Sequence, residues 1–136
     1  MRSTESHVSE DVIWTVERPI KGRFHKFVSN SVEIITITNK TAAKTKKDRM
    51  KASAFSHFAF SRSDGEFMAL DIKVASGVYT DVEIVLAHHA ESTFGVGNMG
   101  SSSMAKFFEE HECNRVCHSA RLERPAGTFG PAFDKQ

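Results

Sequence analysis

Apolar residues are grouped in short runs through the first half of the chain, with polar residues between them. β-branched and aromatic residues recur along 12–27, "VIWTVERPIKGRFHKF", where Pro19 and Gly22 indicate a turn. The run "VEIITI" at 32–37 has the composition of a strand. We therefore expect ordered structure to begin near residue 12 and to include a strand at 32–37.

Two further apolar runs, "AFSHFAF" at 54–60 and "EFMALDIKV" at 66–74, lie on either side of the pair Asp64-Gly65. An Asp-Gly pair between apolar runs is a strong hairpin signal, so the two runs are predicted to pair as antiparallel strands. The Lys-rich segment 38–51 has no clear apolar period. We interpret it as a solvated loop rather than a phosphate-binding patch.

The segment "YTDVEIVLAHHA" at 79–90 is compatible with a strand or a helix. Its apolar positions Val82, Val85 and Leu86 fit a period of about 3.6 residues, which favours a helix. The glycine-rich stretch "FGVGNMG" at 94–100 then predicts a loop.

The last regular element is predicted over 101–122, "SSSMAKFFEEHECNRVCHSARL". Serine is a good helix N-cap, and Met104, Phe107 and Phe108 form an apolar stripe at helical spacing. The chain beyond Pro125 is rich in Gly and Pro and is expected to be a flexible tail.

Composition narrows the classes of protein that fit. The 136 residues are 40% hydrophobic and 26% charged, with a formal net charge of +1, which is typical of one globular domain. This balance is unfavourable for a dedicated nucleic-acid binder, since phosphate binding needs clustered Lys and Arg. No apolar run has the length of a membrane span, and the first residues do not resemble a signal peptide. A cytoplasmic location is the expectation that follows.

The stretch "HECNRVC" at 111–117 contains both cysteines of the chain. A disulfide within one helix would constrain little, and a reducing compartment disfavours it. Structural zinc takes four N or S ligands, of which His111, Cys113 and Cys117 supply three. Two buried free cysteines beside an unrelated histidine are the alternative. The candidates for a fourth ligand are His25, His57, His88, His89 and His118.

Several motifs in order carry a resemblance to a known family. They are "AFSHFAFSRSDGEFMALDIKVASGVYTD", then "FGVGNMG", then "FFEEHECNRVC", preceded by "VERPIKGRFHKFVSN". Together they resemble the hinge and carboxyl-terminal lobe of the alpha-kinases, atypical serine/threonine protein kinases that include myosin heavy chain kinases, elongation factor 2 kinase and channel-kinases. The resemblance extends from about Val16 to about Leu122.

The resemblance implies a structural zinc ion. In that family the histidine of the A-F-S-H-F stretch binds zinc together with an H-x-C-x-x-x-C segment, which nominates His57 as the fourth ligand with His111, Cys113 and Cys117. The alternative for His57 is a core histidine on an apolar strand. The implied fold is α+β, an alpha-kinase-like lobe with a small, mainly antiparallel sheet, a carboxyl-terminal helix and a zinc site.

The resemblance also implies catalytic residues. Asp71 matches the aspartate of the family's D-x-Q pattern, which lies near the phosphates of ATP and its Mg²⁺. Asp81 matches the aspartate of the T-D pattern, a second aspartate of the active site. Carboxylates suit this chemistry because they hold Mg²⁺ and orient or deprotonate the attacking hydroxyl. The alternatives are a strand-end residue for Asp71 and, next to Thr80, a helix N-cap for Asp81.

This sequence departs from the family pattern at the same place. Lys73 replaces the family's glutamine; its ammonium can neutralise phosphate or repel Mg²⁺, but it cannot ligate a metal as a carbonyl does. The segment "DVEIV" after the second aspartate also differs, and "FVSNSV" keeps one asparagine, Asn30, of an asparagine-rich run.

The remaining site expectations concern nucleotide binding. Glu17 lies at the hinge position that the resemblance implies for adenine. The glycine-rich loop matches a family loop near the active site, with a plain turn as the alternative. The predicted nucleotide or substrate contacts of this loop are Gly95, Gly97, Asn98 and Gly100.

These expectations define a disordered segment at 1–11, a partial alpha-type protein kinase domain at 12–124 and a flexible tail at 125–136. The implied activity is transfer of phosphate from ATP to Ser or Thr of a protein substrate. Because about fifteen residues precede the hinge, the amino-terminal lobe is expected from elsewhere, and this chain alone is expected to transfer phosphate feebly. The alternative is a catalytically silent, zinc-stabilised lobe that binds proteins.

Overall fold

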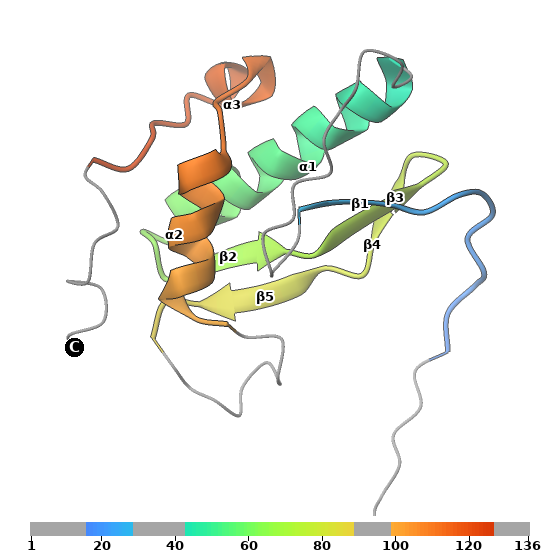
Figure 1. Cartoon of the computed structure of the whole chain (residues 1–136), viewed down its shortest axis with the longest axis horizontal. Coiled ribbons are helices and arrows are strands. Elements are labelled where there is room, and N and C mark those ends of the chain that lie inside the picture. Colours follow the sequence, from blue (N-terminus) through green and yellow to red (C-terminus); the bar gives the residue numbers. More distant parts are fainter. Residues whose placement is uncertain (1–15, 29–42, 89–98, 127–136) are drawn as a thin grey trace, which may run out of the picture.

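The computed structural model describes residues 16–28, 43–88 and 99–126. Within these ranges helices and short antiparallel strands share one chain, so the predicted α+β class is confirmed (Figure 1). The elements in chain order are β1 (His25–Val28), α1 (Ala43–Arg62), β2 (Phe67–Leu70), β3 (Ile72–Ala75), β4 (Val78–Thr80), β5 (Glu83–Leu86), α2 (Ser101–Glu110) and α3 (Arg115–Ser119).

A single hairpin supplies the strands β2 to β5. β2 pairs with β5 and β3 pairs with β4, and the same antiparallel register runs through both pairs, with Leu70 opposite Glu83 and Lys73 opposite Thr80. Each arm is interrupted once, so the base of the hairpin forms one sheet and its tip another, in which β3 also pairs with β1.

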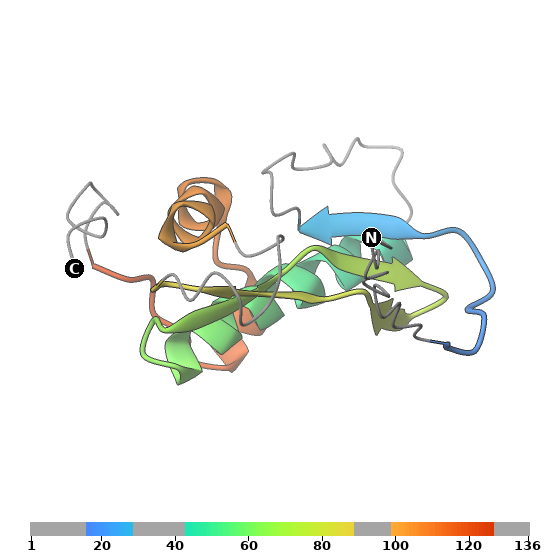
Figure 2. The same ribbon diagram turned by 90° about the horizontal axis from the view of Figure 1, so that it is seen from below.

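The helices enclose a core built largely from this hairpin. α1 packs against β1, β2 and α3, while α2 packs against β5. Figure 2 shows the strands edge-on as a thin layer, with α1 running along their length and α2 at one end. Phe60 of α1 meets Phe108 of α2 edge to face, at 4.8 Å between ring centroids. The largest fully buried apolar side chains are Phe108, Met68, Leu70, Ile72, Met104 and Val85.

From residue 43 onward the predicted loop at 38–51 is wrong, as is the predicted strand at 54–60, because α1 covers Ala43–Arg62. Residues 38–42 lie outside the described residues. Its buried face consists mostly of small or polar residues, including Ala52, Ser56 and His57. Conversely, Phe55 and Phe58 point outward and are 50% and 42% exposed. The buried face of α1 is therefore not the face with most of its large apolar residues. For this reason the pattern of large apolar residues did not show a helical period.

The predicted Asp-Gly hairpin is also wrong. Asp64 and Gly65 end α1 and lead into β2, with φ angles of 53° and 84°. The amide of Gly65 donates to the carbonyl of Phe60 at 2.8 Å, as in a helix that ends with left-handed residues. Such a helix end uses the same residue types as a hairpin turn, so the sequence signal was ambiguous.

The segment 79–90 was predicted to be a helix, but its described residues form the end of β4 and all of β5. Only Val85 is buried on β5, and pairing with β2 outweighs the weak helical period. The predicted single strand at 66–74 is divided into β2 and β3 by Asp71. Long-range strand pairing, which one segment cannot reveal, decides both cases.

The predicted long helix at 101–122 is two helices, α2 and α3, separated by extended residues. The predicted apolar stripe of Met104, Phe107 and Phe108 is confirmed as buried. The predicted serine cap is wrong, because Gly100 occupies the N-cap of α2 without a side-chain hydrogen bond. The predictions at 1–11, 32–37, 94–98 and 127–136 lie outside the described residues.

Candidate metal centre and candidate active site

Two histidines and two cysteines meet between α1 and α3. His57 comes from the middle of α1, His111 and Cys113 from the extended link after α2, and Cys117 from α3. One potential ligand atom from each lies within 4.8 Å of all the others. The four side chains that the resemblance nominated are therefore brought together.

The distances in this His/Cys cluster fit a tetrahedral metal. His57 Nδ1 lies 3.7 Å from Cys113 Sγ, and His111 Nε2 lies 3.6 Å from Cys117 Sγ. Zinc bonds to nitrogen and sulfur place neighbouring ligand atoms about 3.5 Å apart. Both cysteines are free thiols, so the pair forms no disulfide. The residues present fit one Zn²⁺.

Neighbouring groups orient the two histidines. His57 Nε2 lies 3.0 Å from the carbonyl oxygen of Glu123, which favours a proton on Nε2 and leaves Nδ1 free to bind a metal. The guanidinium of Arg124 donates to the carbonyls of Phe108 and His111 and so fixes the end of α2. Glu123 and Arg124 were not predicted, because no sequence motif links them to the cluster.

Burial also sets the protonation of the cluster. It lowers the pKa of His57, and it lowers the pKa of His111 to about 4, so both imidazoles are neutral near pH 7. Burial raises the pKa of the Cys117 thiol. Neutral imidazole is the form that binds metal, whereas the thiol must release its proton when a metal arrives.

The other candidate histidines lie outside this cluster. His88 and His118 are exposed, and the ring of His25 stacks on Phe27 with 6.0 Å between centroids. His89 lies outside the described residues.

The predicted catalytic aspartates occupy the two interruptions of the hairpin. Asp71 lies between β2 and β3, and Asp81 lies between β4 and β5. Both have left-handed backbone conformations, with φ angles of 55° and 57°. Residues other than glycine adopt this conformation at a cost, and such residues are frequent at functional sites. If the register of the two strand pairs is continued through the interruptions, Asp71 and Asp81 belong to neighbouring cross-strand residue pairs on opposite arms of the hairpin.

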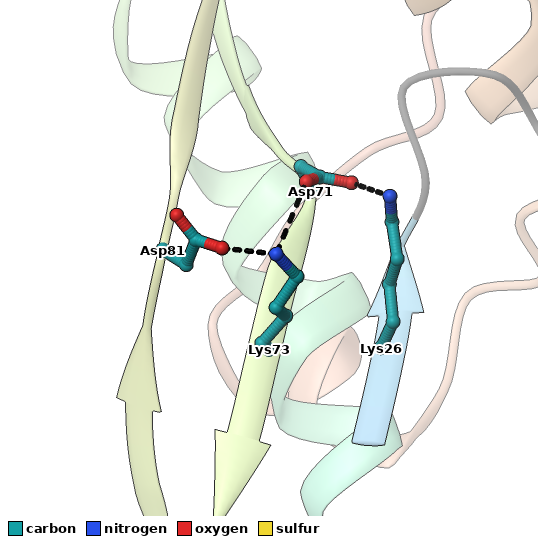
Figure 3. Close-up of polar contacts among 4 residues, drawn as sticks. All are labelled: Lys26, Asp71, Lys73 and Asp81. Carbon is teal, nitrogen blue, oxygen red and sulfur yellow. Dashed lines mark hydrogen bonds and ion pairs between the residues drawn. The ribbon is translucent and has the colours of Figure 1, made fainter. Parts of the chain in front are cut away.

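Lys73 and Lys26 lie against these two carboxylates. Figure 3 shows the Lys73 ammonium between Asp81 and Asp71, and the Lys26 ammonium on the other side of Asp71. Lys73 donates a hydrogen bond to Asp81, and its nitrogen lies 3.9 Å from Asp71 Oδ2. Lys26 forms an ion pair with Asp71 Oδ1. Lys26 was not predicted, since its place follows from the pairing of β1 with β3.

The two aspartates differ in exposure. The side chain of Asp71 is 9% exposed, whereas that of Asp81 is 59% exposed. The hydrogen bond from Lys73 to Asp81 raises the pKa of Lys73, which therefore stays charged. Asp71 is thus a buried partner of two ammonium groups, and Asp81 is the carboxylate that is open to solvent.

This arrangement does not fit a magnesium ion between the aspartates. Each carboxylate already faces an ammonium group, and Lys73 lies where a shared cation would sit. Mg²⁺ takes oxygen ligands, including carboxylates, in near-octahedral geometry. Lys73 would have to leave the space between the two carboxylates before the ion could bind there.

The predicted nucleotide contacts are only partly placed. Glu17 is exposed. Gly100 is buried at the start of α2 with a φ of 68°. Gly95, Gly97 and Asn98 lie outside the described residues, as does Asn30. No helix among the described residues is long and apolar enough to cross a membrane.

Comparison of the sequence with known proteins finds similarity to alpha-kinases. The model of the "Alpha-kinase family" matches residues 2–117. Eukaryotic elongation factor 2 kinase of Mus musculus is 36% identical over 111 residues, which cover 81% of this chain and 14% of that protein. This chain thus spans only a small part of the curated relatives that it matches.

Solved structures agree in fold. The apoenzyme alpha-kinase domain of myosin-II heavy chain kinase A is 31% identical, with a TM-score of 0.63 over 79% of this chain and 38% of that one. The complex of the same kinase domain with ADP gives a TM-score of 0.62 at 31% identity, over 77% of this chain and 38% of that chain.

Proposed function

This chain belongs to the alpha-kinase family, and we propose that it is the part of an alpha-type protein kinase domain that aligns the phosphates of ATP with a serine or threonine hydroxyl of a protein substrate. The observation that carries the proposal is the pair of left-handed aspartates on one hairpin, with a lysine between them. The binding of ADP by a related domain supports a nucleotide as the ligand.

In the proposed reaction the substrate hydroxyl oxygen attacks the γ-phosphorus of ATP. A bond forms between this oxygen and phosphorus, the bond from phosphorus to the β–γ bridging oxygen breaks, and ADP leaves. Asp81, the exposed carboxylate, orients the hydroxyl and accepts its proton. Lys73 offsets negative charge on the phosphates, and Asp71 holds Lys73 and Lys26 in place.

We also propose that His57, His111, Cys113 and Cys117 hold one structural zinc ion. Bound there, the metal would contribute free energy of folding by tying α1 to the segment that links α2 and α3. The close approach of the ligand atoms and the hydrogen bond from His57 to Glu123 support this assignment.

The alternative function is a catalytically silent lobe that binds other proteins. The ion pairs of Lys26 and Lys73 favour it, because they neutralise both carboxylates. A transfer assay separates the two functions. With γ-labelled ATP, a mixture of Ser- and Thr-containing peptides and an alpha-kinase amino-terminal lobe supplied as a separate chain, the kinase proposal expects label on the peptides. Asp81→Asn should reduce this label at least about a hundredfold, as for loss of a general base.

The matched control is Asp64→Asn, since Asp64 is also a left-handed aspartate but lies in the turn after α1. This variant should transfer label as the unchanged chain does. Equal labelling by the unchanged chain and by Asp81→Asn would contradict the kinase proposal and leave the silent lobe as the function.

A further inference from the structure

Lys26 and Lys73 lie directly opposite each other on β1 and β3. Like charges in directly opposed positions of a sheet destabilise it unless other groups compensate them. Here Asp71 contacts both ammonium groups, and Asp81 contacts the second. The two lysines therefore balance the charge of the two aspartates.

We propose that the ammonium of Lys73 takes the place of a divalent cation between Asp71 and Asp81, so that the site holds phosphate groups without Mg²⁺. The part of this proposal that concerns phosphate rests on the proposed function. The part that concerns the cation does not, because it follows from the four charged groups alone.

A divalent cation would meet two obstacles at this site. It would have to displace Lys73 from Asp81 and from the neighbourhood of Asp71, which costs a hydrogen bond between charged groups. It would also bring two positive charges close to Lys26 and Lys73, both of which already lie against the carboxylates. At such distances repulsion between like charges is substantial even near the protein surface.

Lys73 is nevertheless able to reach a phosphate. Its side chain is 33% exposed, so part of the ammonium faces solvent. An ammonium has three N–H donors, and Lys73 donates one hydrogen bond to Asp81. A phosphate oxygen can accept one of the remaining N–H groups while the ion pairs persist. In this arrangement the tethered ammonium performs the charge neutralisation that a dissolved metal performs elsewhere.

Manganese provides a direct test, since Mn²⁺ has ligand preferences close to those of Mg²⁺ and free Mn²⁺ has a strong electron paramagnetic resonance signal. The 136-residue chain is titrated with MnCl₂ without nucleotide. Mn²⁺ binding is assigned to the site between Asp71 and Asp81 only if the change Asp71→Asn removes that binding. The unchanged chain should show no such binding, whereas Lys73→Gln should show it, because one positive charge is lost beside the carboxylates.

Lys106→Gln is the matched control, because Lys106 is an exposed lysine on α2 and its replacement changes the net charge equally. This variant should bind no more Mn²⁺ than the unchanged chain. Should Lys73→Gln lose its fold by circular dichroism, Lys73→Met, which keeps the aliphatic stem, takes its place. Mn²⁺ binding by the unchanged chain that Asp71→Asn removes overturns the proposal, as does a folded Lys73 variant that gains no Mn²⁺ binding.

A second measurement addresses the phosphate. Calorimetric titration of the chain with ATP in a buffer freed of Mg²⁺ but without a chelator, which would also remove zinc, should give the same affinity, within about twofold, as titration with ATP and Mg²⁺. A clear requirement for Mg²⁺ would overturn the proposal. Absence of ATP binding under both conditions would count against the proposed kinase function and against Lys73 as a phosphate ligand, while the Mn²⁺ titration still decides whether Lys73 excludes the divalent cation.

Discussion

At the scale of single residues, the environment of His57 is informative. Its ring is completely buried in α1, one nitrogen meets the carbonyl of Glu123, and the other faces Cys113. A histidine that only filled the core would need no thiol at this distance. Burial also lowers the pKa of His57, so the ring remains a neutral ligand near pH 7.

We predict that His57→Ala abolishes stoichiometric zinc binding, because three ligands do not complete a structural site. Metal analysis of the purified chain should find about one zinc per chain before the change and almost none after it. His118→Ala is the control, since His118 is exposed and follows Cys117 directly. Retention of zinc by His57→Ala would refute the assignment of this ligand.

Sequence reasoning placed some of these residues and not others. His57, His111, Cys113 and Cys117 were nominated because a family motif joins them, and the structure brings them together. Lys26, in contrast, has no motif of its own. Its position beside Asp71 depends on the register between β1 and β3, which only the folded chain reveals.

At the scale of elements, α1 shows why a pattern of large apolar residues can mislead. The helix buries Ala52, Ser56 and His57 and exposes Phe55 and Phe58, so its aromatic residues suggest a strand that does not exist. The apolar stripe of α2 was predictable because Met104 and Phe108 are both large and buried. Periodicity is therefore informative only where size and burial coincide.

The end of α3 offers a further test at this scale. The amide of Leu122 donates to the carbonyl of Cys117, and that of Arg121 to the carbonyl of His118. These two bonds form a Schellman motif, whose left-handed position usually holds glycine. Here it holds Arg121, with a φ of 53°.

We predict that Arg121→Gly raises the free energy of unfolding by about 1 kcal/mol, because glycine adopts the left-handed conformation without steric cost. Urea denaturation followed by circular dichroism measures the change. Arg121→Ala removes the same side chain but keeps the steric cost, so it should give no such increase. Equal stability of the glycine and alanine variants would show that backbone strain is not what limits this helix end.

At the scale of the whole molecule, the His/Cys cluster joins distant parts of the chain. His57 and Cys113 are 56 positions apart, and the hairpin lies between them. A link that closes so long a loop restricts the unfolded chain strongly. We therefore predict that a zinc chelator lowers the thermal midpoint by more than about 10 °C, as expected for a loss of several kcal/mol from a domain of this size.

Differential scanning calorimetry with and without the chelator measures this effect. The variant Cys113→Ser, which lacks one thiolate ligand, should melt near the chelated midpoint and should not respond to the chelator further. An unchanged midpoint of the original chain after complete removal of zinc would show that the core is stable without the metal.

The unbroken register of the hairpin has a practical consequence for protein engineering. Asp71 and Asp81 are at equal depth below the tip to within one residue, so an insertion in only one arm would move one carboxylate past the other. An insertion at the tip would not, because β3 and β4 keep their pairing below it. A Cβ added at Gly77 would meet no atom within 4 Å, but its φ of 82° favours glycine, so residues are best inserted beside Gly77 and not in its place. The tip is therefore a suitable attachment point for a fluorescent reporter or an affinity tag that leaves the spacing of the two aspartates intact.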